Sequence, residues 1–122
     1  MYDERVALIE MPENDCISVC LYCENDDLFA LGERINAKFE EAYMNGYNWD
    51  ALIRCYIGKQ DAQLMSEIES DPEAGMYSGY TSFSPENLEK MKRFEAYLRD
   101  MLTNETRLMT FIRAHQSEIE WD

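Results

Sequence analysis

The stretch RVALIEMPENDCISVCLYC, residues 5–23, decides the fold. Its first part, residues 5–11, is compatible with either a strand or a helical turn. Pro12, Asn14 and Asp15 then favour a turn, because proline fixes φ and the short polar side chains bond to nearby backbone. Residues 17–23 are rich in the β-branched and aromatic residues that suit a strand. Two short runs across a four-residue turn suggest a β-hairpin.

The segments after the hairpin have the period of helices. Apolar residues recur at helical spacing in three successive segments, residues 28–43, 49–57 and 64–68. We expect the first helix to close at Asn45-Gly46 and the second to begin with Asn48 as N-cap and to stop at Gly58. Asp61 is expected to cap the third.

A third strand and two more helices complete the chain. Residues 75–83 fit a strand, in which Gly79 would allow a bulge or a close approach. Ser84-Pro85 is a strong helix start, with a hydroxyl N-cap followed by proline. Thr103-Asn104 should break this helix, and a last helix carries Leu108 to His115. On the wet face of the longer helix we expect the i,i+4 ion pairs Glu86–Lys90, Glu89–Arg93 and Glu95–Arg99.

This order of elements predicts an α+β fold, with a small, largely antiparallel sheet and helices packed on one of its faces. A single domain over residues 1–122 is expected. A chain of this length can bury roughly two-thirds of its unfolded surface, which is enough for a hydrophobic core without disulfide or metal cross-links.

The charge of the chain is −14, and the excess of carboxylates is segregated. Residues 1–30 hold eight acids and one base, residues 61–87 hold six acids and no base, and residues 114–122 hold three acids. Two of these stretches flank expected strands, so the fold can bring them onto one surface. A focused negative field attracts a cationic partner and repels nucleic acid and anionic membranes. The alternative is solubility, because a charge run is usually a solvated face.

The ends and the cysteines point to a soluble cytoplasmic protein. The chain opens with acidic residues in place of a signal peptide, and no apolar run approaches the ~20 residues of a membrane span. On a strand, Cys16 and Cys20 would face one side and Cys23 the other, so the latter two cannot clamp one metal ion. We expect buried reduced thiols and no metal.

Catalytic sets are hard to assemble from these residues. The single histidine, His115, lies on a helical apolar stripe, and the five glycines are isolated, so no phosphate-binding loop exists. We therefore expect a binding protein with no catalytic residue and no cofactor. Two alternatives stay open: a small carboxylate- or metal-dependent hydrolase, and a structural or adaptor module.

Two short constellations carry more information than the periodicity. They are Gly46-Tyr47-Asn48-Trp49-Asp50-Ala51-Leu52 and Asp71-Pro72-Glu73-Ala74-Gly75-Met76-Tyr77. With the strand at residues 18–22, they resemble the immunity protein 51 family of small bacterial proteins associated with polymorphic and contact-dependent toxin systems. The resemblance spans roughly residues 5–115. It implies an α+β immunity protein that binds a cognate toxin domain stoichiometrically and blocks it.

The matching family positions are Gly46, Tyr47, Trp49, Asp71, Pro72, Glu73 and Ala74. Structural roles compete with toxin contact at each: Gly46 would end a helix, Trp49 would anchor the core, and Pro72 would stop a helix. The candidate toxin contacts are Asp26, Asp27, Tyr47, Asp50, Asp71 and Glu73. We hypothesise that the surface built from residues 13–27, 61–73 and 118–122 meets a cationic toxin. A nuclease is one candidate class, because its active-site groove is basic.

Overall fold

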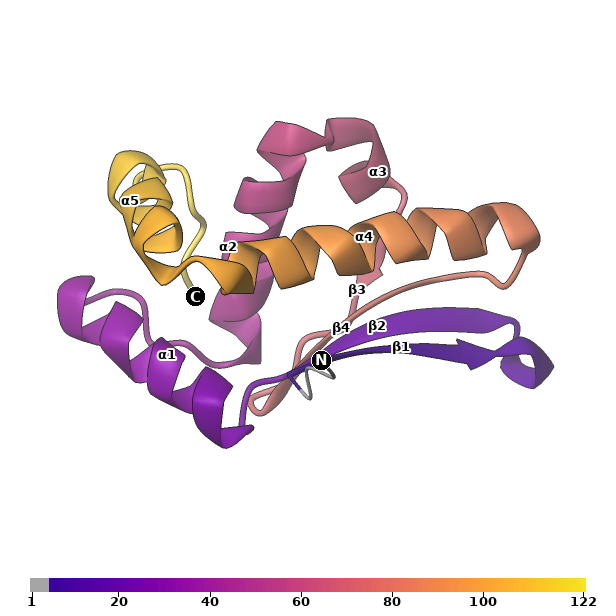
Figure 1. Cartoon of the computed structure of the whole chain (residues 1–122), viewed down its shortest axis with the longest axis horizontal. Coiled ribbons are helices and arrows are strands. Elements are labelled where there is room, and N and C mark those ends of the chain that lie inside the picture. Colours follow the sequence, from indigo (N-terminus) through magenta and orange to yellow (C-terminus); the bar gives the residue numbers. More distant parts are fainter. Residues whose placement is uncertain (1–4) are drawn as a thin grey trace.

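The computed structural model describes residues 5–122 and has an α+β architecture (Figure 1). The four strands are β1 Val6–Met11, β2 Cys16–Tyr22, β3 Glu69–Ser70 and β4 Met76–Thr81. They form one antiparallel sheet in the order β1-β2-β4-β3. The helices are α1 Asp26–Lys38, α2 Gly46–Gln60, α3 Ala62–Ser66, α4 Pro85–Thr103 and α5 Glu105–His115, and a short 3-10 turn, η1 Pro12–Asn14, joins β1 to β2. The predicted fold class and hairpin are confirmed, and β1 is a strand.

The sheet has one buried and one open face. On β2, Ile17, Val19 and Leu21 are fully buried and point toward the helices. Because side chains alternate along a strand, Cys16, Ser18 and Cys20 lie on the opposite, open face, where Ser18 and Cys20 are nonetheless only 6% exposed. The register continues both faces across the sheet: Val19 pairs with Leu8 of β1 and with Gly79 of β4.

The helical layer lies on the buried face. In Figure 1, α4 runs along β1 and β2, and α2 packs against β4. Helices α1 and α5 lie beyond one end of the sheet. The predicted close approach at Gly79 is confirmed, since a Cβ there would lie 2.7 Å from the ring of Phe94 on α4. The open face carries Ile9, 36% exposed, and the partly exposed Tyr80.

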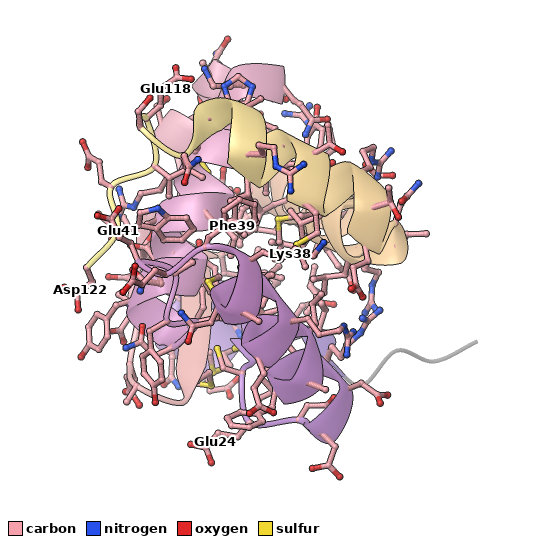
Figure 2. The ribbon with its side chains drawn as sticks, turned by 90° about the vertical axis from the view of Figure 1, so that its left-hand side faces the viewer. Glu24, Lys38, Phe39, Glu41, Glu118 and Asp122 are labelled. Carbon is pink, nitrogen blue, oxygen red and sulfur yellow. The ribbon has the colours of Figure 1, made fainter. Side chains whose placement is uncertain are left out.

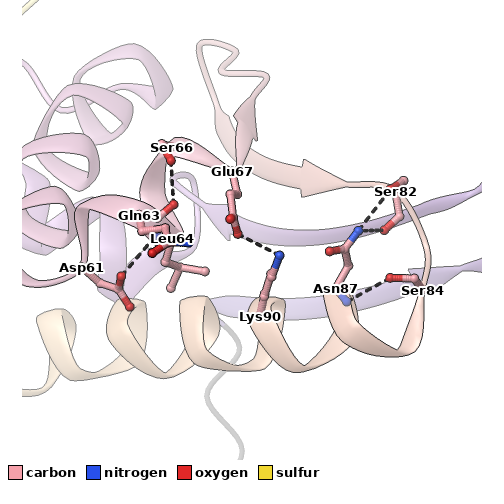
Figure 3. Close-up of polar contacts among 9 residues, drawn as sticks. All are labelled: Asp61, Gln63, Leu64, Ser66, Glu67, Ser82, Ser84, Asn87 and Lys90. Carbon is pink, nitrogen blue, oxygen red and sulfur yellow. Dashed lines mark hydrogen bonds and ion pairs between the residues drawn. The ribbon is translucent and has the colours of Figure 1, made fainter.

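Several helix boundaries follow the sequence signals. The Ser84 hydroxyl accepts a hydrogen bond from the Asn87 amide at 3.0 Å, with Pro85 at the first helical position (Figure 3). Asp61 caps α3 by accepting from the Leu64 amide at 3.1 Å. Asn104 separates α4 from α5 and caps the latter. The caps at Ser84 and Asp61 were predicted because the bond from a polar side chain to the helix amides is local, whereas Asn104 was predicted only as a helix break.

Other boundaries were wrong. Helix α1 ends at Lys38, where the Asn36 amide donates to the carbonyls of Phe39 and Glu40 at 3.4 and 3.3 Å and satisfies the end of the helix. The N-cap of α2 is Asn45, which accepts from the Asn48 amide at 3.0 Å. Gly58 lies inside α2 and does not stop it.

The expected surface ion pairs formed only in part. Glu95 and Arg99 pair at 2.8 Å. Lys90 instead binds Glu67 at the end of α3, at 2.9 Å, because α3 lies over α4 there (Figure 3). The short strand β3 was not predicted, because two residues are too few to show an alternation of apolar and polar side chains.

Candidate functional site

The two family-like segments meet at the first turn of α2. The Gly46 amide donates a hydrogen bond to the Ala74 carbonyl at 3.1 Å. A Cβ on Gly46 would overlap the carbonyl oxygens of Glu73 and Met76, so only glycine fits there. Gly46 therefore begins a helix, and the expectation that it ends one was wrong.

The loop between β3 and β4 is held by its backbone. The Asp71 amide donates to the Ser78 carbonyl at 2.8 Å, and the Glu73 amide to the Met76 carbonyl at 2.7 Å. Both residues are exposed. Pro72 lies in this loop and does not stop a helix, because α3 already ends at Ser66. The loop thus presents two carboxylates to solvent beside the start of α2.

Asn48, also in the first turn of α2, ties three segments together. Its side chain is almost fully buried, at 2% exposure. The amide group donates to the Tyr43 carbonyl at 2.8 Å, and the side-chain oxygen accepts from the Asp122 backbone amide at 2.6 Å. With Ile119 buried, these contacts fix the tail, residues 116–122, against α2. Trp49 beside it is fully buried in the core.

A groove of about 660 Å³ runs between α2 and this tail. It is lined by residues of both segments: Tyr47, Asp50, Ala51, Arg54, Cys55, Gly58, Lys59, Glu118, Glu120, Trp121 and Asp122. We call it the α2–tail groove. In Figure 2, Glu118 and Asp122 of the tail lie along one edge of the view, with Glu41 between them.

Internal ion pairs occupy both basic side chains of the α2–tail groove. Arg54 binds both Asp50 oxygens at 3.0 Å. Glu118 accepts from Lys59 at 2.8 Å and is bonded to the His115 ring at 2.6 Å. Lys59 and, secondarily, His115 hold the pKa of Glu118 below its usual range.

Two carboxylates of the groove remain unpaired. Over residues 5–122, Glu120 and Asp122 have no basic side chain within ion-pair distance, and both are exposed. Because the two bases of the groove are already neutralised, the tail carboxylates leave it net negative.

Exposed aromatic side chains surround the start of α2. Tyr47, 44% exposed, lies in the α2–tail groove. Tyr43, 69% exposed, and Phe29, 53% exposed, line a smaller groove of about 290 Å³ beside α1, together with Met44. Tyr43 was predicted to share the apolar stripe of a helix, but α1 ends before it and its ring faces solvent.

The remaining candidates lie elsewhere. Asp26 and Asp27 occupy the first turn of α1, where their negative charges interact favourably with the helix dipole. Neither residue lines a groove described above. Asp15, Glu67 and Glu69 line a third groove, between the hairpin turn and β3. Residues 1–30 and 61–87, the two acidic stretches that flank strands, therefore meet at this third groove, as expected, whereas the carboxylates of the tail lie in the α2–tail groove. The sequence analysis named Tyr47 and Asp50 as candidate contacts but did not name Tyr43, Asn48 or Trp121.

Three of the four cysteines are poor nucleophiles in this setting. Burial raises the pKa of Cys20 and Cys55, and raises that of Cys23 to about 11. The residues described here contain no group of three or more His, Cys, Asp or Glu that could hold a metal ion. No helix in residues 5–122 combines the length and the apolar character needed to cross a bilayer.

Comparison with known proteins identifies a family. No curated protein and no solved structure matches the chain. A family described as Immunity protein 51 matches residues 7–117, which include α2, the β3–β4 loop and the Gly46–Ala74 junction. The match covers most of the 122 residues, so the chain belongs to the immunity protein 51 family.

Proposed function

We propose that this protein neutralises a cognate bacterial toxin domain in the cytoplasm by binding it stoichiometrically and occluding it. Membership of the immunity protein 51 family, over residues 7–117, is the observation that carries the proposal. The mechanism is inhibition by contact, in which the immunity protein makes and breaks no bonds.

The charge of the chain supports a cationic partner. A formal charge of −14 on 122 residues gives a strong negative field. Such a field accelerates association with a positively charged protein and disfavours nucleic acid as a partner. A nuclease is a suitable toxin class, because the groove that holds its substrate must be positive.

The state of the reactive groups favours binding over nucleophilic catalysis. His115 is engaged with Glu118 at 2.6 Å and packs against Phe111, with the two rings tilted and their centroids 4.5 Å apart. Cys20, Cys23 and Cys55 have raised pKa values, so few of their thiols are ionised at neutral pH. These groups serve packing and tail docking more readily than chemistry.

Co-expression tests the proposal. The partner to be tested is the C-terminal domain of a large modular protein encoded by the adjoining gene, where a cognate toxin is expected. Cells carrying both proteins should survive, and the two chains should purify together in equal amounts. The control is Trp49→Ala, which leaves a large cavity in the core and should lower the free energy of unfolding by about 3–5 kcal/mol. Cell death despite abundant folded protein, or rescue without any complex, would contradict the proposal.

A further inference from the structure

Three of the four most exposed large apolar side chains gather around the α1–α2 connection. Over residues 5–122 these four are Ile9, Phe29, Tyr43 and Tyr47, and only Ile9 lies on the open face of the sheet. Single exposed apolar residues are ordinary, but a cluster around two grooves is typical of an interaction surface. The cluster is an observation independent of charge.

The backbone beneath these aromatics is firmly held. The Tyr43 carbonyl is bound by the buried Asn48 amide, and Tyr47 follows Gly46, which is fixed against Ala74. Asn48 also anchors Asp122 on the far side of the groove. Because the rings are carried by ordered backbone, this part of the protein loses little conformational entropy when a partner binds.

The groove selects the charge of its occupant. Arg54 and Lys59 are neutralised by Asp50 and Glu118, while Glu120 and Asp122 pair with no base among residues 5–122. A cationic group entering the α2–tail groove therefore meets carboxylates and the Tyr47 ring together. The guanidinium of arginine suits both, since it stacks on aromatic faces and forms forked bonds to carboxylates.

We propose that Tyr43, Tyr47, Glu120 and Asp122 form the surface that receives an arginine-bearing segment of the cognate toxin. This inference rests on the proposed function and adds the location of the contact and the chemistry of the segment. Tyrosine and arginine dominate binding energy at many interfaces, where they occupy a centre shielded by weaker contacts. Tyr47 is the expected centre, because it lies in the groove itself.

The test measures association and dissociation rates with the purified C-terminal domain of the toxin encoded by the adjoining gene. Tyr47→Ala should weaken binding by about 30-fold or more, mainly through faster dissociation. The double variant Glu120→Gln with Asp122→Asn should slow association several-fold and flatten its dependence on salt. Circular dichroism checks that each variant is folded.

Matched controls lie at the competing surfaces. The double variant Glu13→Gln with Glu69→Gln removes the same number of negative charges at another place, and Glu69 lies in the third groove. Tyr80→Ala removes a partly exposed tyrosine from the open face of the sheet. Each control should stay within about twofold of the wild type, because rim and remote contacts contribute little.

The outcomes separate this inference from the proposed function. If the wild type binds and the controls lose affinity while the groove variants do not, the contact lies elsewhere and the inference fails alone. If the wild type does not bind, the proposed function fails as well. Modification of the toxin's arginines with a dione should abolish binding, whereas acetylation of its lysines should spare it; the reverse would overturn arginine as the recognised residue.

Discussion

Gly46 and Ala74 are joined by a backbone hydrogen bond of 3.1 Å that locks the first turn of α2 against the β3–β4 loop. The contact explains why two distant segments of the sequence carry the family-like pattern. Each segment needs the other: the glycine admits the loop, and the loop carbonyls leave no room for a side chain at position 46.

We expect Gly46→Ala to destabilise the fold by about 3 kcal/mol, since the added methyl meets rigid backbone oxygens. Gly58→Ala is the matched control, because a Cβ there meets nothing within 4 Å and the residue lies inside α2. It should stabilise by about 0.5–1 kcal/mol. Urea unfolding monitored by circular dichroism measures both, and equal effects of the two substitutions would contradict the tight junction.

Removing the Asn48 side chain should release the tail. Asn48→Ala leaves the Tyr43 carbonyl and the Asp122 amide without their partner, at a cost of about 1–3 kcal/mol. Limited proteolysis should then cut residues 116–122 much faster than in the wild type. Asn14→Ala, at an exposed position in η1, is the control and should leave the rate unchanged. An uncut tail in the Asn48 variant would show that Ile119 and the Lys59–Glu118 ion pair hold it without Asn48.

Acid should weaken the anchoring of the tail. The pKa of Glu118 lies below its usual value of 4.5, chiefly through Lys59 and then through His115. A lowered folded-state pKa gives stability that is complete above the unfolded value and is lost as the pH falls through the folded value. We therefore expect the wild type to have the higher free energy of unfolding at pH 7. Its advantage over Glu118→Gln should vanish in acid, below the pKa of Glu118 in the folded state.

The control for this pH series is Glu120→Gln, which alters the charge of the same tail without removing an ion pair. It should not reproduce the difference seen with Glu118→Gln. A gap that stays constant from neutral to acidic pH would show that the Glu118 carboxylate is not held by its partners.

Alkylation should separate the cysteines by burial. Burial raises the pKa of Cys23 to about 11, and the residue is only 4% exposed. Its thiol should react with iodoacetamide at pH 8 only after unfolding, whereas the partly exposed Cys16 should react in the native protein. Mass spectrometry of time points resolves the sites, and rapid native labelling of Cys23 would contradict its buried placement.

The sequence was sufficient where a signal is local. Ser84 and Asp61 were recognised as caps because the side chain bonds to the amide three residues further on. The hairpin followed from a turn between two strands. These features depend little on the rest of the fold, so the residue types alone define them.

Tertiary contacts decided what the sequence could not show. The apolar spacing continues past Lys38 to Phe39 and Ala42, which are buried although they have left the helix, so periodicity overran the end of α1. Asn48 looks like a cap, and its role depends on Tyr43 and Asp122, which only the fold brings near. Exposed Tyr43 was missed for the same reason.

The central claim is that one copy of this protein inactivates one copy of its toxin by contact alone. The direct measurement is the residual activity of the purified toxin domain as increasing amounts of the protein are added. Activity should fall in proportion to the protein added and reach zero at one equivalent, with no change on longer incubation. Complete inactivation by a small fraction of an equivalent, or full activity in excess protein, would contradict the claim.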